Sequence, residues 1–126
     1  MVCKSVEEYF QTDFDLEVAI PIGHPSKNHK FDYVSDDKKI VVEFKCCTWT
    51  DTGNVPSAKM MGMNEALFYM GYLPEDTTKV LCIKKVVHPK KQETLAEYYV
   101  RIDGHLLWDV KVFEVDEQGR IKVIKS

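Results

Sequence analysis

No apolar segment of the chain is long enough to cross a membrane. A spanning helix needs about 18 consecutive apolar residues, and polar or charged residues interrupt every shorter run in this sequence. The first residues, MVCKSVEEYF, also lack the uninterrupted apolar stretch of a signal peptide. Four cysteines are present, and without export we expect them to stay reduced. These absences predict a cytoplasmic protein.

The sequence also has little that would build a thiolate or histidine metal site. Cys46 and Cys47 are adjacent, so in a strand their side chains point to opposite faces and do not easily share a tetrahedral site. The four histidines include no pair at ligand spacing, and none is adjacent to a credible nucleophile. The net charge is −3, so the chain as a whole does not attract a polyanion.

What is present predicts one α/β domain over residues 1–126. Apolar residues make up 44% and charged residues 29% of the chain, as in ordinary soluble globular proteins, and there are no repeats or linkers. Hydrophobic periodicity predicts helices and strands in a definite order. The expected elements are a helix over 3–12, a strand over 16–22, a loop over 23–29, a strand through Asp32, a strand from Ile40 to Trp49, a helix over 57–72, a central strand over 80–83, a helix over 91–106 with Leu95, Tyr98, Tyr99 and Ile102 inward, and strands over 110–115 and 121–124.

The segment KFDYVSDDKKIVVEFK, residues 30–45, carries the clearest functional signal. It predicts two strands joined by a polar turn, and strict alternation places Glu43 and Lys45 on one face. A turn centred between Asp37 and Lys38 puts Asp32 directly opposite Glu43 on that face. Two like charges at such positions are destabilising. A divalent cation held by carboxylate oxygens is the simplest way to neutralise them.

The spacing of Asp32 and Glu43-Phe44-Lys45 resembles the PD-(D/E)XK phosphodiesterase superfamily, the restriction-endonuclease-like nucleases. The proline that begins the family signature is absent, since Phe31 precedes Asp32. The element order α-β-β-β-α-β, followed by a helix and a hairpin, is similar to the common core of the same superfamily. The resemblance therefore implies a restriction-endonuclease-like core, with a mixed central β-sheet flanked by helices.

The resemblance also implies a chemistry. Asp32 and Glu43 would ligate Mg²⁺ or Mn²⁺, with the backbone carbonyl of Phe44 as a third ligand, and Lys45 would assist the attacking water. The function implied is metal-dependent hydrolysis of phosphodiester bonds in nucleic acid, with DNA as the expected substrate.

The first helix often supplies a further acid in this family, and Glu7 or Glu8 is available for that role here. The alternative is that both are solvated acids favoured by the helix dipole. Glu17, on the polar face of the first strand, is a weaker candidate.

Substrate contacts are expected from local groups of basic residues. Ser57 and Lys59 lie near a predicted helix N-terminus, which is a natural anion site, and His29 and Lys30 precede the strand of Asp32. Such residues would contact phosphates without choosing a base sequence. The alternative for each lysine is an ordinary solvated surface position. Trp49 is expected either to stack on a base or to cover the core.

Two other interpretations remain open at this point. One is a non-catalytic nucleic-acid-binding or assembly module on the same fold. The other is a small α/β protein in which Lys45 forms a structural ion pair with Asp32 or Glu43. A chain of this size has little surface for sequence recognition, so a homodimer, a partner subunit or structure-selective cleavage is expected.

Overall fold

The computed structural model describes residues 2–126, apart from the side chains of residues 57–59. Its elements are α1 (Val2–Phe10), β1 (Phe14–Ile22), β2 (Lys27–Ser35), β3 (Ile40–Lys45), α2 (Ser57–Met70), β4 (Thr78–Lys84), α3 (Leu95–Asp103), the short 3-10 helix η1 (Gly104–Leu106), β5 (Lys111–Val115) and β6 (Ile121–Lys125). The predicted order of helices and strands is confirmed.

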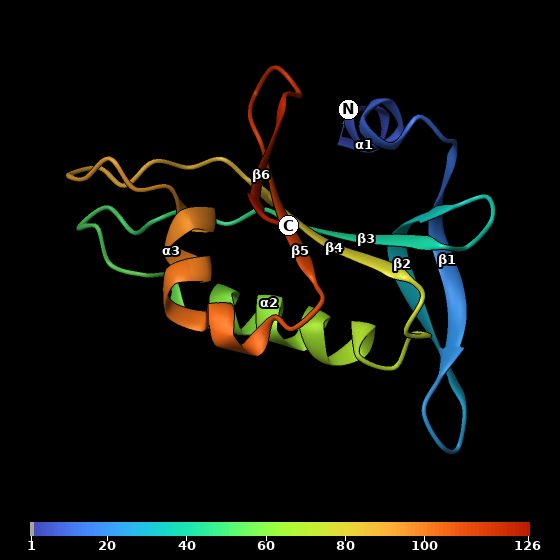
Figure 1. Ribbon diagram of the computed structural model, residues 1–126. Helices are drawn as coiled ribbons and strands as arrows, with labels where there is room; N and C mark the ends of the chain where they lie inside the picture. Colours follow the sequence, from blue (N-terminus) through green and yellow to red (C-terminus); the bar gives the residue numbers. More distant parts are fainter. Residues whose placement is uncertain (1) are drawn as a thin grey trace.

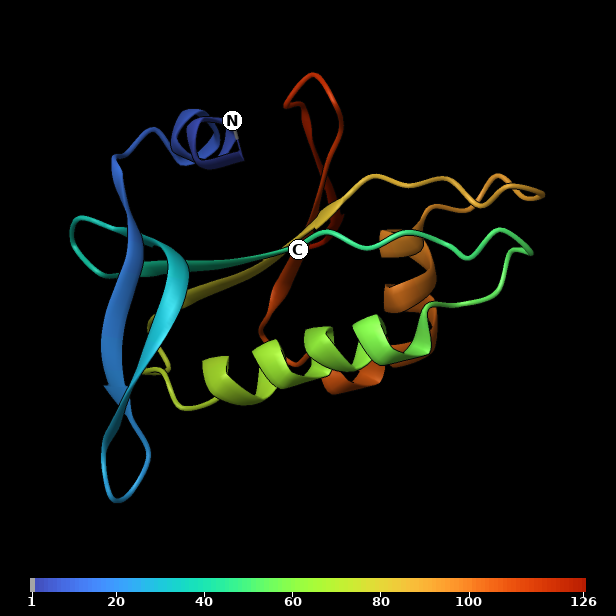
Figure 2. The ribbon, with the colours of Figure 1, turned by 180° about the vertical axis from the view of Figure 1, so that it is seen from behind.

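A six-stranded mixed sheet, in the order β1-β2-β3-β4-β5-β6, organises the described residues. β1, β2 and β3 form an antiparallel meander, β4 and β5 run parallel to β3, and β6 returns antiparallel to β5. Figures 1 and 2 show α1 on one side of the sheet and α2 and α3 on the other. The parallel pairs require crossovers, and α2 and α3 provide them. The protein is therefore an α/β protein.

Each face of the sheet has its own hydrophobic core. Val41 and Leu81 belong to the core under α2 and α3, whereas Val42 and Cys82 belong to the core under α1. Because neighbouring residues in a strand face opposite ways, a strand in the middle of such a sheet must be apolar on both faces. The run from Val80 to Ile83 is buried throughout, which confirms the predicted central strand.

The helices follow their apolar spacing, with local exceptions. Met63 and Met70 of α2 are fully buried, but Met61 is 70% exposed, so not every methionine of this helix packs in the core. α3 begins at Leu95, later than predicted, because Thr94 caps it through a capping box with Glu97. Within the described residues, no helix is long and apolar enough to span a membrane.

Several predicted boundaries and orientations are wrong. β2 already begins at Lys27 and β3 ends at Lys45. Beyond β3 the chain leaves the sheet, and Trp49 turns into the core, where its Nε1 donates to the carbonyl oxygen of Val86 at 3.0 Å. Trp49 therefore covers the core. Ile102 was expected to face inward, but it is 44% exposed in the last turn of α3.

Candidate functional site

The turn between β2 and β3 sets the register of the candidate site. The Oδ1 atom of Asp37 accepts hydrogen bonds from the Ser35 hydroxyl at 2.7 Å and the Lys39 N–H at 3.0 Å, and Lys38 takes a left-handed φ of 61°. Asp and Ser are suited to such turns because their side chains bond to nearby backbone. Beyond the turn, Val34 pairs with Val41, as the predicted register requires.

Regular pairing between the two strands stops where Asp32 and Glu43 would meet. The last backbone pair is Tyr33 with Val42. Beyond it, the Asp32 N–H donates to Oε1 of Glu43 at 2.9 Å, and the Phe44 N–H donates to Oδ2 of Asp32 at 2.8 Å. At this point the side-chain carboxylates of Asp32 and Glu43, in place of backbone carbonyl groups, accept the hydrogen bonds between the two strands.

This geometry corrects the expectation that both acids stand on one face of the sheet. Phe31 packs in the α2–α3 core and Tyr33 against the α1 core, so the alternation of β2 breaks at Asp32. Backbone N–H groups of a strand point within the plane of the sheet toward the neighbouring strand. The carboxylates of Asp32 and Glu43 therefore lie in the gap between β2 and β3.

The ladder is also interrupted on the other side of Asp32. Leu16 pairs with Tyr33 and Val18 pairs with Phe31, but the intervening residue, Glu17, has a left-handed φ of 50° and forms no such pair with Asp32. Residues other than glycine rarely adopt that backbone conformation. A shallow pocket of about 310 Å³ opens here, lined by Leu16, Glu17, Asp32, Tyr33 and Phe44. Glu17, a weak candidate from sequence, is thus the further acid that lines the pocket.

Glu43 is a charged group in an environment that disfavours charge. Only 6% of the Glu43 surface is exposed to solvent. Burial is the main cause that raises the pKa of Glu43 to about 7, and the negative charge of Asp32 acts in the same direction, whereas the Asp32 N–H and the Lys45 ammonium act to lower it. A cation near this carboxylate would relieve both the burial penalty and the repulsion.

Lys45 acts on Glu43 at a distance. The two residues are two positions apart in β3, and the Lys45 charge lowers the pKa of Glu43. Within the described part of the chain, Lys45 makes no ion pair with Asp32 or Glu43 within 4.0 Å. The interpretation of Lys45 as a structural ion-pair partner therefore has no contact to support it.

The proposed extra acid, Glu7, has a different partner. Its Oε2 atom accepts the Phe14 N–H at 2.8 Å, which joins the end of α1 to the start of β1. Phe14 pairs with Ser35, three residues along β2 from Asp32. Glu7 therefore fastens a helix to the sheet, and the structure does not bring it to Asp32 and Glu43.

Of the residues expected to contact substrate, the two with described side chains, His29 and Lys30, do not line the pocket. His29 stacks on Tyr69 of α2, with ring centroids 3.9 Å apart, and so packs between sheet and helix. Lys30 is exposed on the β1–β2 ribbon, opposite Ala19. Ser57 and Lys59 have side chains outside the described residues.

The donor set fits a hard divalent cation in part. Mg²⁺ is commonly held by one or two protein carboxylates, with water and substrate phosphate completing its shell, and Asp32 and Glu43 meet that minimum. Among the residues with described side chains, no three of the His, Cys, Asp and Glu groups lie close enough together to hold a metal ion. Glu17 therefore lines the pocket without completing a three-carboxylate site.

Comparisons with known proteins add no assignment to this geometry. No family model matches the chain, and neither a curated protein nor a solved structure is significantly similar to it.

Proposed function

We propose that this protein is a metal-dependent nuclease that hydrolyses phosphodiester bonds in nucleic acid, with DNA as its substrate. The observation that supports it is the gap between β2 and β3, where the buried Glu43 and the adjacent Asp32 replace the backbone ladder beside a pocket. Keeping two like charges together costs stability. A function in binding a cation, and through it an anionic substrate, would explain why the protein keeps the two carboxylates together despite this cost.

In this proposal Asp32 and Glu43 hold Mg²⁺ or Mn²⁺, and the carbonyl of Phe44 is a further oxygen ligand. When bound, such an ion supplies Lewis acidity and lowers the pKa of a ligated water. Lys45 places a positive charge near the developing negative charge of the reaction. Glu17, across the pocket from β3, repels a phosphate that approaches without a cation, which makes substrate binding depend on the metal.

The first experiment separates metal binding from catalysis. Thermal unfolding is measured with EDTA and with Mg²⁺ or Mn²⁺. Because the ion binds the folded state, it should stabilise the wild type, by about 2.7 kcal/mol at a concentration 100 times its Kd. Asp32→Asn should lose that gain. Asp36→Asn, which changes an exposed carboxylate in the neighbouring turn, should keep it.

The second experiment measures cleavage of single-stranded, double-stranded and branched DNA, and of RNA, with the same ions. Lys45→Ala should keep the metal-induced stabilisation but lower the cleavage rate by at least about 100-fold, the usual loss when a charge-stabilising group is removed. Asp36→Asn serves again as the control. Stabilisation by metal without cleavage of any substrate would instead favour a non-catalytic nucleic-acid-binding module. No stabilisation and no cleavage would remove the proposal.

A further inference from the structure

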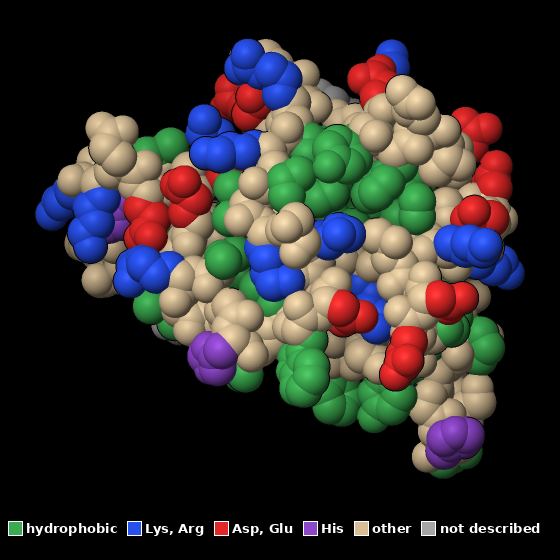
Figure 3. Space-filling view, in the orientation of Figure 1, with side chains coloured by type: hydrophobic (Ala, Val, Ile, Leu, Met, Phe, Trp, Pro, Cys, Tyr) green, Lys and Arg blue, Asp and Glu red, His purple; other side chains and the backbone are tan. Residues whose placement is uncertain are grey.

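Large hydrophobic side chains remain exposed along one surface of the protein, formed by the outer side of α2 and the segment before β5. We call it the α2–Trp108 surface. Its members are exposed by 70% (Met61), 65% (Phe68), 51% (Tyr72), 48% (Leu106) and 87% (Trp108). Figure 3 shows hydrophobic side chains gathered at the lower margin of the molecule, where α2 lies. The rings of Phe68 and Tyr72 contact each other, with centroids 5.5 Å apart.

Trp108 is held in this exposed position by its backbone. Its φ is 51°, in the left-handed region that a bulky residue rarely adopts. The Lys125 ammonium fixes that conformation by donating to the carbonyl oxygens of Trp108 and Val110, both at 2.9 Å. Backbone strain of this kind persists where surrounding structure imposes it, and it is common at binding sites. Here its result is an indole that projects into solvent.

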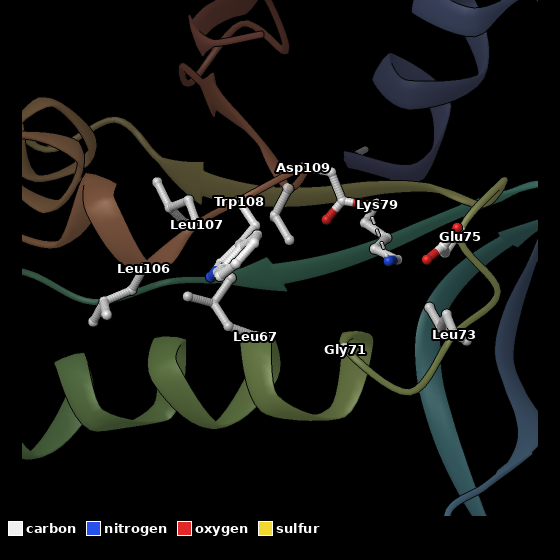
Figure 4. Close-up of a pocket in the computed structure, with 10 residues that line it drawn as sticks. Leu67, Gly71, Leu73, Glu75, Lys79, Leu106, Leu107, Trp108 and Asp109 are labelled. Atoms are coloured by element: carbon white, nitrogen blue, oxygen red, sulfur yellow. Dashed lines mark hydrogen bonds and ion pairs between the residues drawn. The ribbon is translucent and has the colours of Figure 1, made fainter.

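A hollow lies next to the projecting indole. It has a volume of about 620 Å³, and its apolar lining includes Leu67, Leu73 and Val110. Figure 4 shows Trp108 beside Leu67 of α2, with Lys79 and Asp109 farther along the same hollow. The surface therefore carries both a projection and a cavity. Two copies of such a surface can pair across a two-fold axis, because the projection of each copy then fills the cavity of the other.

We propose that the α2–Trp108 surface is the interface of a homodimer, in which Trp108 of each copy occupies the hollow of the other. The three exposed aromatic residues alone offer roughly 300–500 Å², estimated from about 150–250 Å² for a whole aromatic side chain. That is about half of the roughly 800 Å² that each partner buries in a standard interface. Met61, Leu106 and the lining of the hollow contribute the rest. Aromatic residues at the centre of such a patch are typical binding hot spots.

The charges around the surface also favour a second copy. The Lys125 ammonium lies against the carbonyl oxygen of Trp108. Asp109 follows Trp108 in the chain, and its side chain is 58% exposed even though it pairs with Lys79 at 3.1 Å. Glu75 adds a second carboxylate to that rim. The surface thus carries charges of both signs, as a face that pairs with a copy of itself requires, whereas the two carboxylates would repel a nucleic acid.

Sedimentation equilibrium of the full chain, from about 1 to 100 μM protein, tests the proposal. The wild type should dimerise within this range. Trp108→Gly should raise the dimer Kd at least tenfold, the order expected for a hot spot. Since glycine accepts a left-handed φ without strain, thermal unfolding of this variant at low concentration should not be impaired. Phe68→Glu, on the exposed side of α2, should weaken the dimer in the same way and provides a second variant if the first fails to fold.

The matched control is Leu16→Ser, which removes a side chain that is also exposed, by 62%, but on β1. Its dimer Kd should equal that of the wild type. A wild type that stays monomeric at every concentration overturns the proposal, as does a folded Trp108→Gly variant that dimerises like the wild type. The proposal does not depend on nuclease activity, so the two can fail separately.

Discussion

Glu43→Gln should make the protein more stable at high pH. The amide removes the negative charge but keeps an oxygen that can accept the Asp32 N–H. In the wild type, the folded carboxyl group has a pKa of about 7 against the ordinary 4.5, so the folded state binds the proton more tightly than the unfolded chain. The stabilisation from this proton is complete below pH 4.5 and is lost as the pH rises through about 7.

The size of the effect follows from the pKa difference. A difference of one pKa unit corresponds to about 1.4 kcal/mol, so the shift at Glu43 predicts a loss of about 3 kcal/mol between the two limits. The group is nearly fully buried, so solvent screens it little. Near pH 8, Glu43→Gln should therefore exceed the wild type by up to about 3 kcal/mol in free energy of unfolding, while near pH 4.5 the two should be similar.

Urea unfolding followed by circular dichroism, in EDTA and at pH values from about 4.5 to 8, measures this difference. Glu8→Gln makes the same chemical change at an exposed position of α1 and should follow the wild type. With Mn²⁺ present, the wild type should recover stability at high pH and Glu43→Gln should gain less. Parallel pH curves for the wild type and Glu43→Gln would refute the reasoning, because they would show that Glu43 ionises in the folded state without penalty.

Two further predictions concern the core. Thr94→Ala should lower the free energy of unfolding by about 2–3 kcal/mol, because the Thr94 hydroxyl both caps α3 and donates to the buried Glu114 carboxylate at 2.5 Å. Thr94→Ser keeps the hydroxyl and should lose less than half as much stability. Urea titration of the two variants measures the difference. Met63→Ala should cost about 2–5 kcal/mol by leaving a cavity under α2, where this side chain is fully buried, and a change of less than about 1 kcal/mol would contradict the packing described.

Much of the fold follows from short-range signals in the chain. The turn residues around Asp37 fix the register of β2 and β3 without help from the rest of the protein, because their hydrogen bonds are local. The run from Val80 to Ile83 requires cover on both faces, and only a central strand provides it. For these elements, the local pattern and the tertiary environment agree.

The break in the sheet could not be predicted in the same way. Period-2 alternation assumes a regular ladder, and it therefore placed Asp32 and Glu43 on one face. The observed gap is filled by hydrogen bonds from the Asp32 and Phe44 N–H groups to two carboxylates, and no alternation within β2 or β3 indicates such bonds. The sequence left the role of Glu7 open for a related reason. Its partner is the Phe14 N–H, so its role depends on how α1 docks on the sheet.

The two tryptophans illustrate why burial could not be predicted from sequence patterns alone. Trp49 and Trp108 both lie in segments without regular structure, and composition alone does not distinguish them. Trp49 finds the Val86 carbonyl as a buried acceptor for its N–H, whereas Lys125 holds the Trp108 backbone in a conformation that directs the ring outward. Both outcomes depend on residues far away in the chain.

The kink at Glu17 also affects how the protein behaves when it is concentrated. β1 is one of the two edges of the sheet, and an edge of this length offers unpaired N–H and C=O groups to any other extended chain. A left-handed residue near its middle and Pro21 near its end leave no long straight row of such groups. Fibril growth by strand addition is thereby discouraged at β1, at the same residue that lines the pocket with Asp32.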